Sequence, residues 1–256
     1  MDFWTIGGVV TSIGVVVFLI IHEAEGVGVG IFINMPAFIL CVIGPFICLA
    51  ISNSWKDFRS LIGIMKTAFF VTPPDAKPVI EQLVRYAEIA RRDGILALEG
   101  VVDEIKDPFL VKGVQLAVDG TDPELIEQIM STELEYLEER HKVGRKMMDV
   151  LSLLSPSLGL VGCVMGLILM LVALAKSGGD PSVVAAKMAT AMVATFYGVA
   201  LANMVYIPLA NKLNRKHLEE KLLRQIVMRG VMSIQSGDNP RIVEQKLKIF
   251  LPPKER

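Results

Sequence analysis

Four long apolar stretches stand out from the polar background of this 256-residue chain. They cover Phe3–Ile21, Met35–Ile51, Val150–Ala175 and Val183–Ala210, and none contains an aspartate or a glutamate. The third has no charged residue at all. As a helix it would be ~39 Å long, which exceeds the ~30 Å hydrocarbon core of a bilayer. The pattern predicts an all-α integral membrane protein with four transmembrane helices, of which the second is short and kinked at Pro45.

The segment between the second and third spans, residues 53–149, shows helical periodicity and no convincing strand. Asp93-Gly94 interrupts its helices, and Thr121-Asp-Pro-Glu124 supplies a cap, a proline and an acid for the start of another helix. We expect four segments: residues 1–52 with spans one and two, 53–149 as a helical cytoplasmic domain, 150–211 with a hairpin of spans three and four, and 212–256 as a helical tail.

The basic residues set the expected topology. Of the 26 lysines and arginines, 13 lie between Asn53 and Asp149 and 11 lie after Asn211. Because basic residues are retained on the cytoplasmic side, the middle segment, the tail and both termini are expected in the cytoplasm.

Small residues recur at helical spacing in the last two spans. Span three carries Ser155, Gly159, Gly162 and Gly166, and span four carries Ala191, Thr195, Gly198 and Ala202. A helix face without bulk lets a second backbone approach closely, so these faces predict helix packing. Packing alone would explain them. The prolines Pro156 and Pro208, one in each helix, favour an additional functional role.

The composition narrows the possible chemistry. A 52% apolar content, a mean hydropathy of +0.51 and a net charge of −1 indicate a membrane protein and give no sign of nucleic-acid binding. The three cysteines and three histidines are isolated, so no metal site is expected, and no enzyme motif is present. Membrane ion relays normally use a carboxylate. The polar groups of the last two spans include hydroxyls, an amide and a thiol, namely those of Ser155, Ser157, Cys163, Thr190, Thr195, Tyr197 and Asn203. If the protein conducts ions, another chain must supply the carboxylate.

These two spans also resemble a known family. Pro156-Ser-Leu-Gly-Leu-Val-Gly-Cys-Val-Met-Gly-Leu-Ile168, Ala191-Met-Val-Ala-Thr-Phe-Tyr-Gly198 and Pro208-Leu-Ala-Asn-Lys-Leu213 look like the MotA/PomA family, the A-subunits of the flagellar stator. The resemblance covers essentially the whole chain. It implies a pentameric ring in the bacterial inner membrane around two copies of a B-subunit (MotB or PomB) that supplies the membrane aspartate.

The resemblance also implies roles for single residues. Pro156 and Pro208 match prolines associated with coupling, and Thr195 matches a threonine that faces the ion path. Arg91 and Glu99 match charged positions that contact the rotor protein FliG. Cys163 stands where sodium-type members generally carry threonine. A thiol is a poor ligand for sodium, so we expect protons as the coupling ion, with sodium as the alternative.

Two other functions stay open at this point. One is an ExbB/TolQ-like subunit, a more distant relative that energises the outer membrane with the same kind of engine. The other is a passive scaffold whose small-residue faces serve assembly only.

Overall fold

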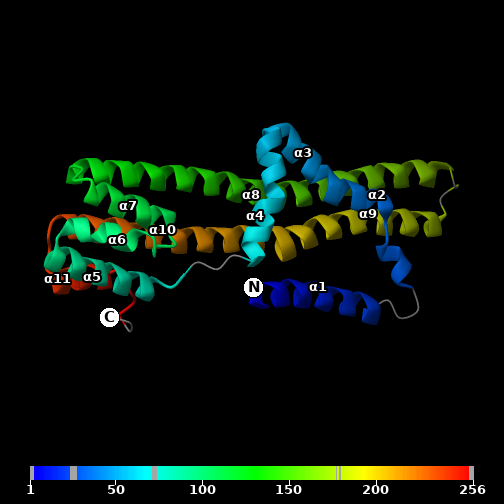
Figure 1. Ribbon diagram of the computed structural model, residues 1–256. Helices are drawn as coiled ribbons and strands as arrows, with labels where there is room; N and C mark the ends of the chain where they lie inside the picture. The colour runs from blue at the N-terminus through cyan, green and yellow to red at the C-terminus, as the bar shows by residue number, and fades with distance from the viewer. Residues whose placement is uncertain (1–2, 24–27, 71–73, 177, 179, 254–256) are drawn as a thin grey trace. The chain divides into compact units, whose positions relative to one another are not determined.

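The computed structural model of the chain describes residues 3–23, 28–70, 74–176, 178 and 180–253, which form helices and their connections (Figure 1). No strand occurs among these residues. The elements are α1 Phe3–Glu23, η1 Val29–Phe32, α2 Met35–Phe38, η2 Ile39–Ile43, α3 Gly44–Ser52, α4 Trp55–Phe70, α5 Ala76–Asp93, η3 Ile95–Leu98, α6 Glu99–Val102, α7 Pro108–Val118, α8 Pro123–Lys176, α9 Pro181–Leu201, η4 Ala202–Tyr206, α10 Ile207–Gln235 and α11 Pro240–Lys248. The predicted all-α class is confirmed.

Three helical stretches are long and apolar enough to cross a membrane: Val29–Ser52, Pro123–Lys176 and Pro181–Gln235. They contain the second, third and fourth predicted spans. The first predicted span lies in α1, in which the stretch Gly7–Glu23 is a shorter apolar helix. The third span is the C-terminal part of α8, a helix of 54 residues that starts in the predicted middle segment.

The chain divides into two compact units that cut across the four predicted segments. Unit 1 comprises Met1–Thr72 and Lys142–Asn214, and unit 2 comprises Pro73–His141 and Arg215–Arg256. Helices α8 and α10 contribute to both units because each is much longer than a single span.

The core of unit 2 joins the predicted middle segment to the predicted tail. Leu83 of α5, Phe109 and Leu110 of α7, Ile226 of α10 and Leu247 of α11 are almost completely buried in one apolar cluster. The amphipathic pattern of these helices is therefore satisfied by contacts between distant parts of the sequence.

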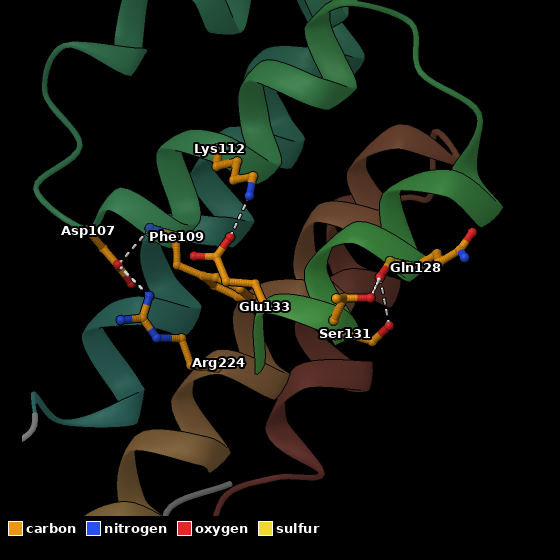
Figure 2. Close-up of polar contacts among 8 residues, drawn as sticks. Asp107, Phe109, Lys112, Gln128, Ser131, Glu133 and Arg224 are labelled. Carbon is orange, nitrogen blue, oxygen red and sulfur yellow. Dashed lines mark hydrogen bonds and ion pairs between the residues drawn. The ribbon is translucent and has the colours of Figure 1, made fainter. Parts of the chain in front are cut away.

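Polar contacts tie the helices of unit 2 together at the edge of this core (Figure 2). Asp107 caps α7 by accepting from the amide of Phe109 at 3.0 Å, and Arg224 of α10 donates to the same carboxylate at 2.8 Å. The Arg224 guanidinium also lies 4.8 Å from the centre of the Phe109 ring, within reach of a cation–π interaction. Lys112 of α7 pairs with Glu133 of α8 at 2.6 Å.

A separate apolar cluster forms in unit 1 where α3, α4, α8 and α10 meet. Its buried members include Leu49, Leu61, Met148, Leu151 and Leu209. Helix α4 follows the predicted second span in the sequence and packs against α8. A Cβ atom on Gly144 of α8 would lie 3.0 Å from the Cδ1 of Ile64 in α4.

Two short π-helical segments precede prolines, and the prolines explain them. An α-helical carbonyl accepts from the amide four residues later, and proline has no N–H. The segment η2 ends two residues before Pro45, and η4 ends two residues before Pro208. In both, the amide that follows the segment donates to the carbonyl five residues back, Gly44 to Ile39 and Ile207 to Ala202. The irregular second span expected from Pro45 is confirmed.

Candidate functional site: the α8–α9 hairpin

Helices α8 and α9 pack through their small residues. A Cβ atom on Gly159 would lie 2.9 Å from the carbonyl oxygen of Ala194, and one on Gly166 would lie 2.5 Å from the Cβ of Ala191. In the opposite direction, a Cβ on Gly198 would lie 2.5 Å from the carbonyl oxygen of Ser155. These contacts are within one chain, so the small-residue faces bring the two spans of the hairpin together.

The predicted second span packs against the same hairpin. A Cβ atom on Gly162 would lie 2.8 Å from the Cβ of Ala194 and 2.9 Å from Cδ2 of Leu40. Ala202 is also buried, at 1% exposure, in the π turn η4. Bulk at Gly162 would therefore disturb the fold of the chain itself, in addition to any contact with a partner.

A buried polar network links these three spans. Ser155 and Cys41 are both fully buried. The Ser155 hydroxyl donates to the carbonyl oxygen of Cys41 at 3.1 Å, and the Cys41 thiol donates to the carbonyl of Ala194 at 3.1 Å. In an α-helix the Cys41 carbonyl would accept from residue 45, which is Pro45 and has no N–H. Sequence reasoning considered the cysteines as possible metal ligands and missed this network. The signal was a proline four residues after the cysteine.

Two of the predicted ion-path residues line the packed face of the hairpin. Gly198 approaches Pro156, because a Cβ on this glycine would lie 3.0 Å from the proline Cα. Gly159 approaches Thr195, whose Cα would be 3.3 Å from a Cβ at position 159. The Thr195 hydroxyl oxygen is buried, and within the described residues it has no hydrogen-bond partner. Such a hydroxyl is available to a ligand or to a group from another chain.

The other predicted ion-path residues lie elsewhere on these helices. Cys163 is partly buried on α8, one turn after Gly159, and its thiol is free of disulfide bonding. Tyr197 donates its hydroxyl to the carbonyl of Phe32 and lines an apolar cavity of about 320 Å³ together with Ile13 of α1. Pro208 is exposed in the first turn of α10. Tyr197 thus contacts η1, the short helix that precedes α2.

The predicted rotor-contact residues flank a bend on the surface of unit 2. Arg91 lies in the last turn of α5 and Glu99 is the first residue of α6, and both are exposed. Gly94 makes the bend possible because its φ of +88° is accessible mainly to glycine. Leu96 lies between them and is 68% exposed. The neighbouring Arg92 donates to Asp93 and lowers the pKa of that carboxyl.

No group of three or more histidine, cysteine or acidic side chains that could hold a metal occurs in the part of the chain that the structure describes. The described turn between α8 and α9 carries Asp180, which caps α9 by accepting from the amide of Ser182 at 2.9 Å. These bonds from Ser182 lower the pKa of Asp180.

Comparison with known proteins gives consistent results. Residues 101–239 match the model of the MotA/TolQ/ExbB proton channel family. The chain is 38% identical to motility protein A of Borreliella burgdorferi over 90% of its own length and 86% of the relative's. It is 32% identical to chemotaxis protein PomA of Vibrio alginolyticus over 98% and 96%. The structure of C. jejuni MotAB superposes with a TM-score of 0.88 at 31% identity, covering 99% of this chain and 97% of the other.

Three apolar helices of spanning length, two of them joined along glycine faces, define a multi-pass membrane protein. The chain belongs to the MotA/TolQ/ExbB proton channel family, as a stator subunit of the motility A type. The resemblance predicted from the hairpin sequence is thereby confirmed. The family consists of ion channels, in agreement with the prediction that the protein is not an enzyme.

Proposed function

We propose that this subunit joins a B-subunit in a flagellar stator complex, conducts protons through the membrane and converts the ion flow into torque on the rotor. One observation carries the proposal: the structural match to an A-subunit of a MotAB stator extends over 99% of this chain.

The B-subunit has a chemical role in this proposal. The four apolar stretches, Phe3–Ile21, Met35–Ile51, Val150–Ala175 and Val183–Ala210, contain no aspartate or glutamate, and a proton relay in a bilayer needs such a group. The B-subunit would bring a membrane aspartate to the hairpin. The buried and unpaired hydroxyl of Thr195 would be one of the groups that receives it, with Pro156 and Cys163 on the neighbouring helix α8.

The proposed topology has four spans. Helix α1 would be the first span, because its 21 residues are ~32 Å long and apolar. The distribution of lysine and arginine supports cytoplasmic termini, with residues 53–149 and 212–256 also in the cytoplasm and residues 1–52 and 150–211 holding the spans.

Assembly and output complete the proposal. We propose a ring of five copies around the B-subunits in the bacterial inner membrane. The exposed side chains of Arg91 and Glu99 would contact the rotor protein FliG. Charges of both signs suit a contact that forms and releases quickly, because electrostatic attraction raises association rates more than affinity.

Deletion of the gene in its host tests the function. Cells without the chain should keep their flagella and lose swimming, and the gene supplied in trans should restore it. Flagellated cells that still swim, in a host with no second A-subunit gene, would contradict the proposal. An unchanged motility together with a defect in outer-membrane uptake would instead favour the ExbB/TolQ-like role.

A further inference from the structure

A basic pocket lies in unit 1 between α8 and α10, directly beside the start of the apolar part of α8. Its volume is about 460 Å³, and its polar lining comprises Lys142, Arg145, Lys146, Asp149, Asn211 and Asn214. The α8 residues recur every three or four positions and therefore share one helix face. The two asparagines are three positions apart and share a face of α10 in the same way.

The charge of the pocket favours an anion. Arg145 and Lys146 outnumber the one carboxylate, that of Asp149, and two neutral amides complete the polar lining beside Lys142. The Arg145 guanidinium donates to the side-chain oxygen of Asn214, which fixes its orientation. Its Nε is nevertheless buried, and among the described residues it has no hydrogen-bond partner. A buried donor without an acceptor is costly, so this site is incomplete as the chain alone forms it.

The position of the pocket identifies the kind of anion. Asp149 is followed immediately by Val150, where the uncharged run of α8 begins. The pocket therefore lies at the depth where hydrocarbon gives way to lipid headgroups. Basic pockets between membrane helices at this depth bind acidic lipid headgroups, and the cytoplasmic leaflet is the one rich in such lipids.

We propose that this pocket binds the phosphate of an anionic phospholipid, such as phosphatidylglycerol, with Arg145 and Lys146 as the principal donors. Arg145 would supply its buried Nε–H, and Lys146 would supply a mobile positive charge at the rim. A zwitterionic lipid carries a cation beside its phosphate and would be repelled by the excess of basic groups. The proposal rests on the topology stated above, which places this end of α8 on the cytoplasmic side.

Lipid binding can be measured on the full-length chain in its assembled form, purified in detergent and freed of bound lipid. Native mass spectrometry then counts the lipids retained when phosphatidylglycerol or phosphatidylcholine is added. We expect phosphatidylglycerol to bind and phosphatidylcholine not to bind at the same concentration. Inorganic phosphate at the same concentration should not displace the lipid, since it lacks acyl chains to pack against the neighbouring spans.

Lys146→Gln is the main variant, because Lys146 is exposed and its loss should leave the fold intact. It should weaken phosphatidylglycerol binding about fivefold, since one basic group near a membrane surface contributes about that factor. Lys146→Arg should retain the affinity. The matched control is Lys187→Gln in α9, which removes the same charge from an exposed position outside the pocket.

The outcomes separate the possible explanations. Equal binding of both lipids, or equal weakening by Lys146→Gln and Lys187→Gln, would overturn the proposal. Displacement of the lipid by inorganic phosphate would show a site for a free anion. Phosphatidylglycerol binding that is unchanged in Lys146→Gln would likewise overturn it. None of these results depends on swimming, so the proposed motor function and the lipid site can fail independently.

Discussion

The hydroxyl of Ser155 and the carbonyl of Cys41 are hydrogen-bonded at 3.1 Å, although they lie 114 residues apart in the sequence. Both residues are fully buried, and the bond joins the irregular helix η2 to the middle of α8 within unit 1. The hydroxyl of Ser155 supplies the hydrogen bond that the Cys41 carbonyl would otherwise lack, because Pro45 has no N–H to donate. The serine thus compensates for the proline.

Ser155→Ala should destabilise this unit by about 1 kcal/mol, because hydrogen bonds between membrane helices contribute on that order. Unfolding of the purified chain in detergent, followed by circular dichroism during titration with a denaturing detergent, measures the loss. Ser157→Ala is the control, since the Ser157 hydroxyl is exposed and bonds only to Leu153 of its own helix among the contacts described. Equal stability of the two variants would contradict the role assigned to Ser155.

Gly198→Ala should separate α8 from α9. The added Cβ would lie 2.5 Å from the carbonyl oxygen of Ser155, and backbone atoms cannot move aside as a flexible side chain can. We expect a loss of about 1–3 kcal/mol in the same unfolding assay, as for other overpacked sites. Gly14→Ala in α1 meets nothing within 4 Å and should be neutral. A stable, fully motile Gly198→Ala strain would rule out the close approach of the two helices.

Arg224→Gln should weaken unit 2 more than the loss of an exposed ion pair would. Arg224 is 22% exposed and contacts both Asp107 and the Phe109 ring, as Figure 2 shows. Its removal should lower the free energy of unfolding by about 1–2 kcal/mol, because bonds to charged, partly buried groups are stronger than average. Lys112→Gln breaks a pair whose side chains are 49% and 41% exposed and should cost under about 1 kcal/mol.

Arg91→Glu and Glu99→Lys should each impair swimming while the complex still conducts ions. Both side chains are exposed on unit 2, so their reversal leaves its core unchanged. A charge reversal on the rotor side should partly restore motility, because complementary charges guide such contacts. Lys77→Glu, at the exposed start of α5, is the control and should swim normally. Loss of ion flow in the Arg91 variant would place this residue in folding or conduction.

The coupling ion can be tested at Cys163. We expect motility to persist when sodium is replaced by potassium at constant proton-motive force, because a neutral thiol is a poor ligand for sodium. Cys163→Ala should swim like the unmodified strain, and Cys163→Thr should not acquire a sodium requirement by itself. Swimming that stops in potassium would assign sodium. Failure of Cys163→Ala would give the thiol a role in the path.

The helices were predictable from sequence because their signals are local. The uncharged run after Asp149, the cap at Thr121-Asp-Pro-Glu124 and the break at Gly94 each depend on neighbouring residues, and the structure contains α8 and the α5–η3 bend accordingly. The small-residue faces could be identified in the same way. The helix that packs against each face could not be identified, because the spacing of small residues shows that a face permits close approach and does not show which helix approaches it.

The shared core of unit 2 was beyond the reach of local patterns. Leu83 contacts α10, where a Cβ on Gly230 would lie 2.7 Å from one of its methyl groups, and 147 residues separate these positions. An amphipathic helix predicts a buried face and leaves the covering segment undetermined. For the same reason the tail could be predicted as helical but not as part of the core.

Each π turn also holds one residue more than the α-helical turn it replaces, and this changes the phase of everything that follows. An extra residue turns the downstream helix by about 100° relative to a regular count. Leu209 and Ala210 are buried because η4 has set that rotation, and Asn211 and Asn214 inherit it. Removal of one residue from Ala202–Tyr206 would leave a smoother helix and would turn Leu209 and Ala210 by about 100° away from their buried positions. A deletion in this π-helical segment would therefore change which residues of α10 are buried more than it would change the length of the helix.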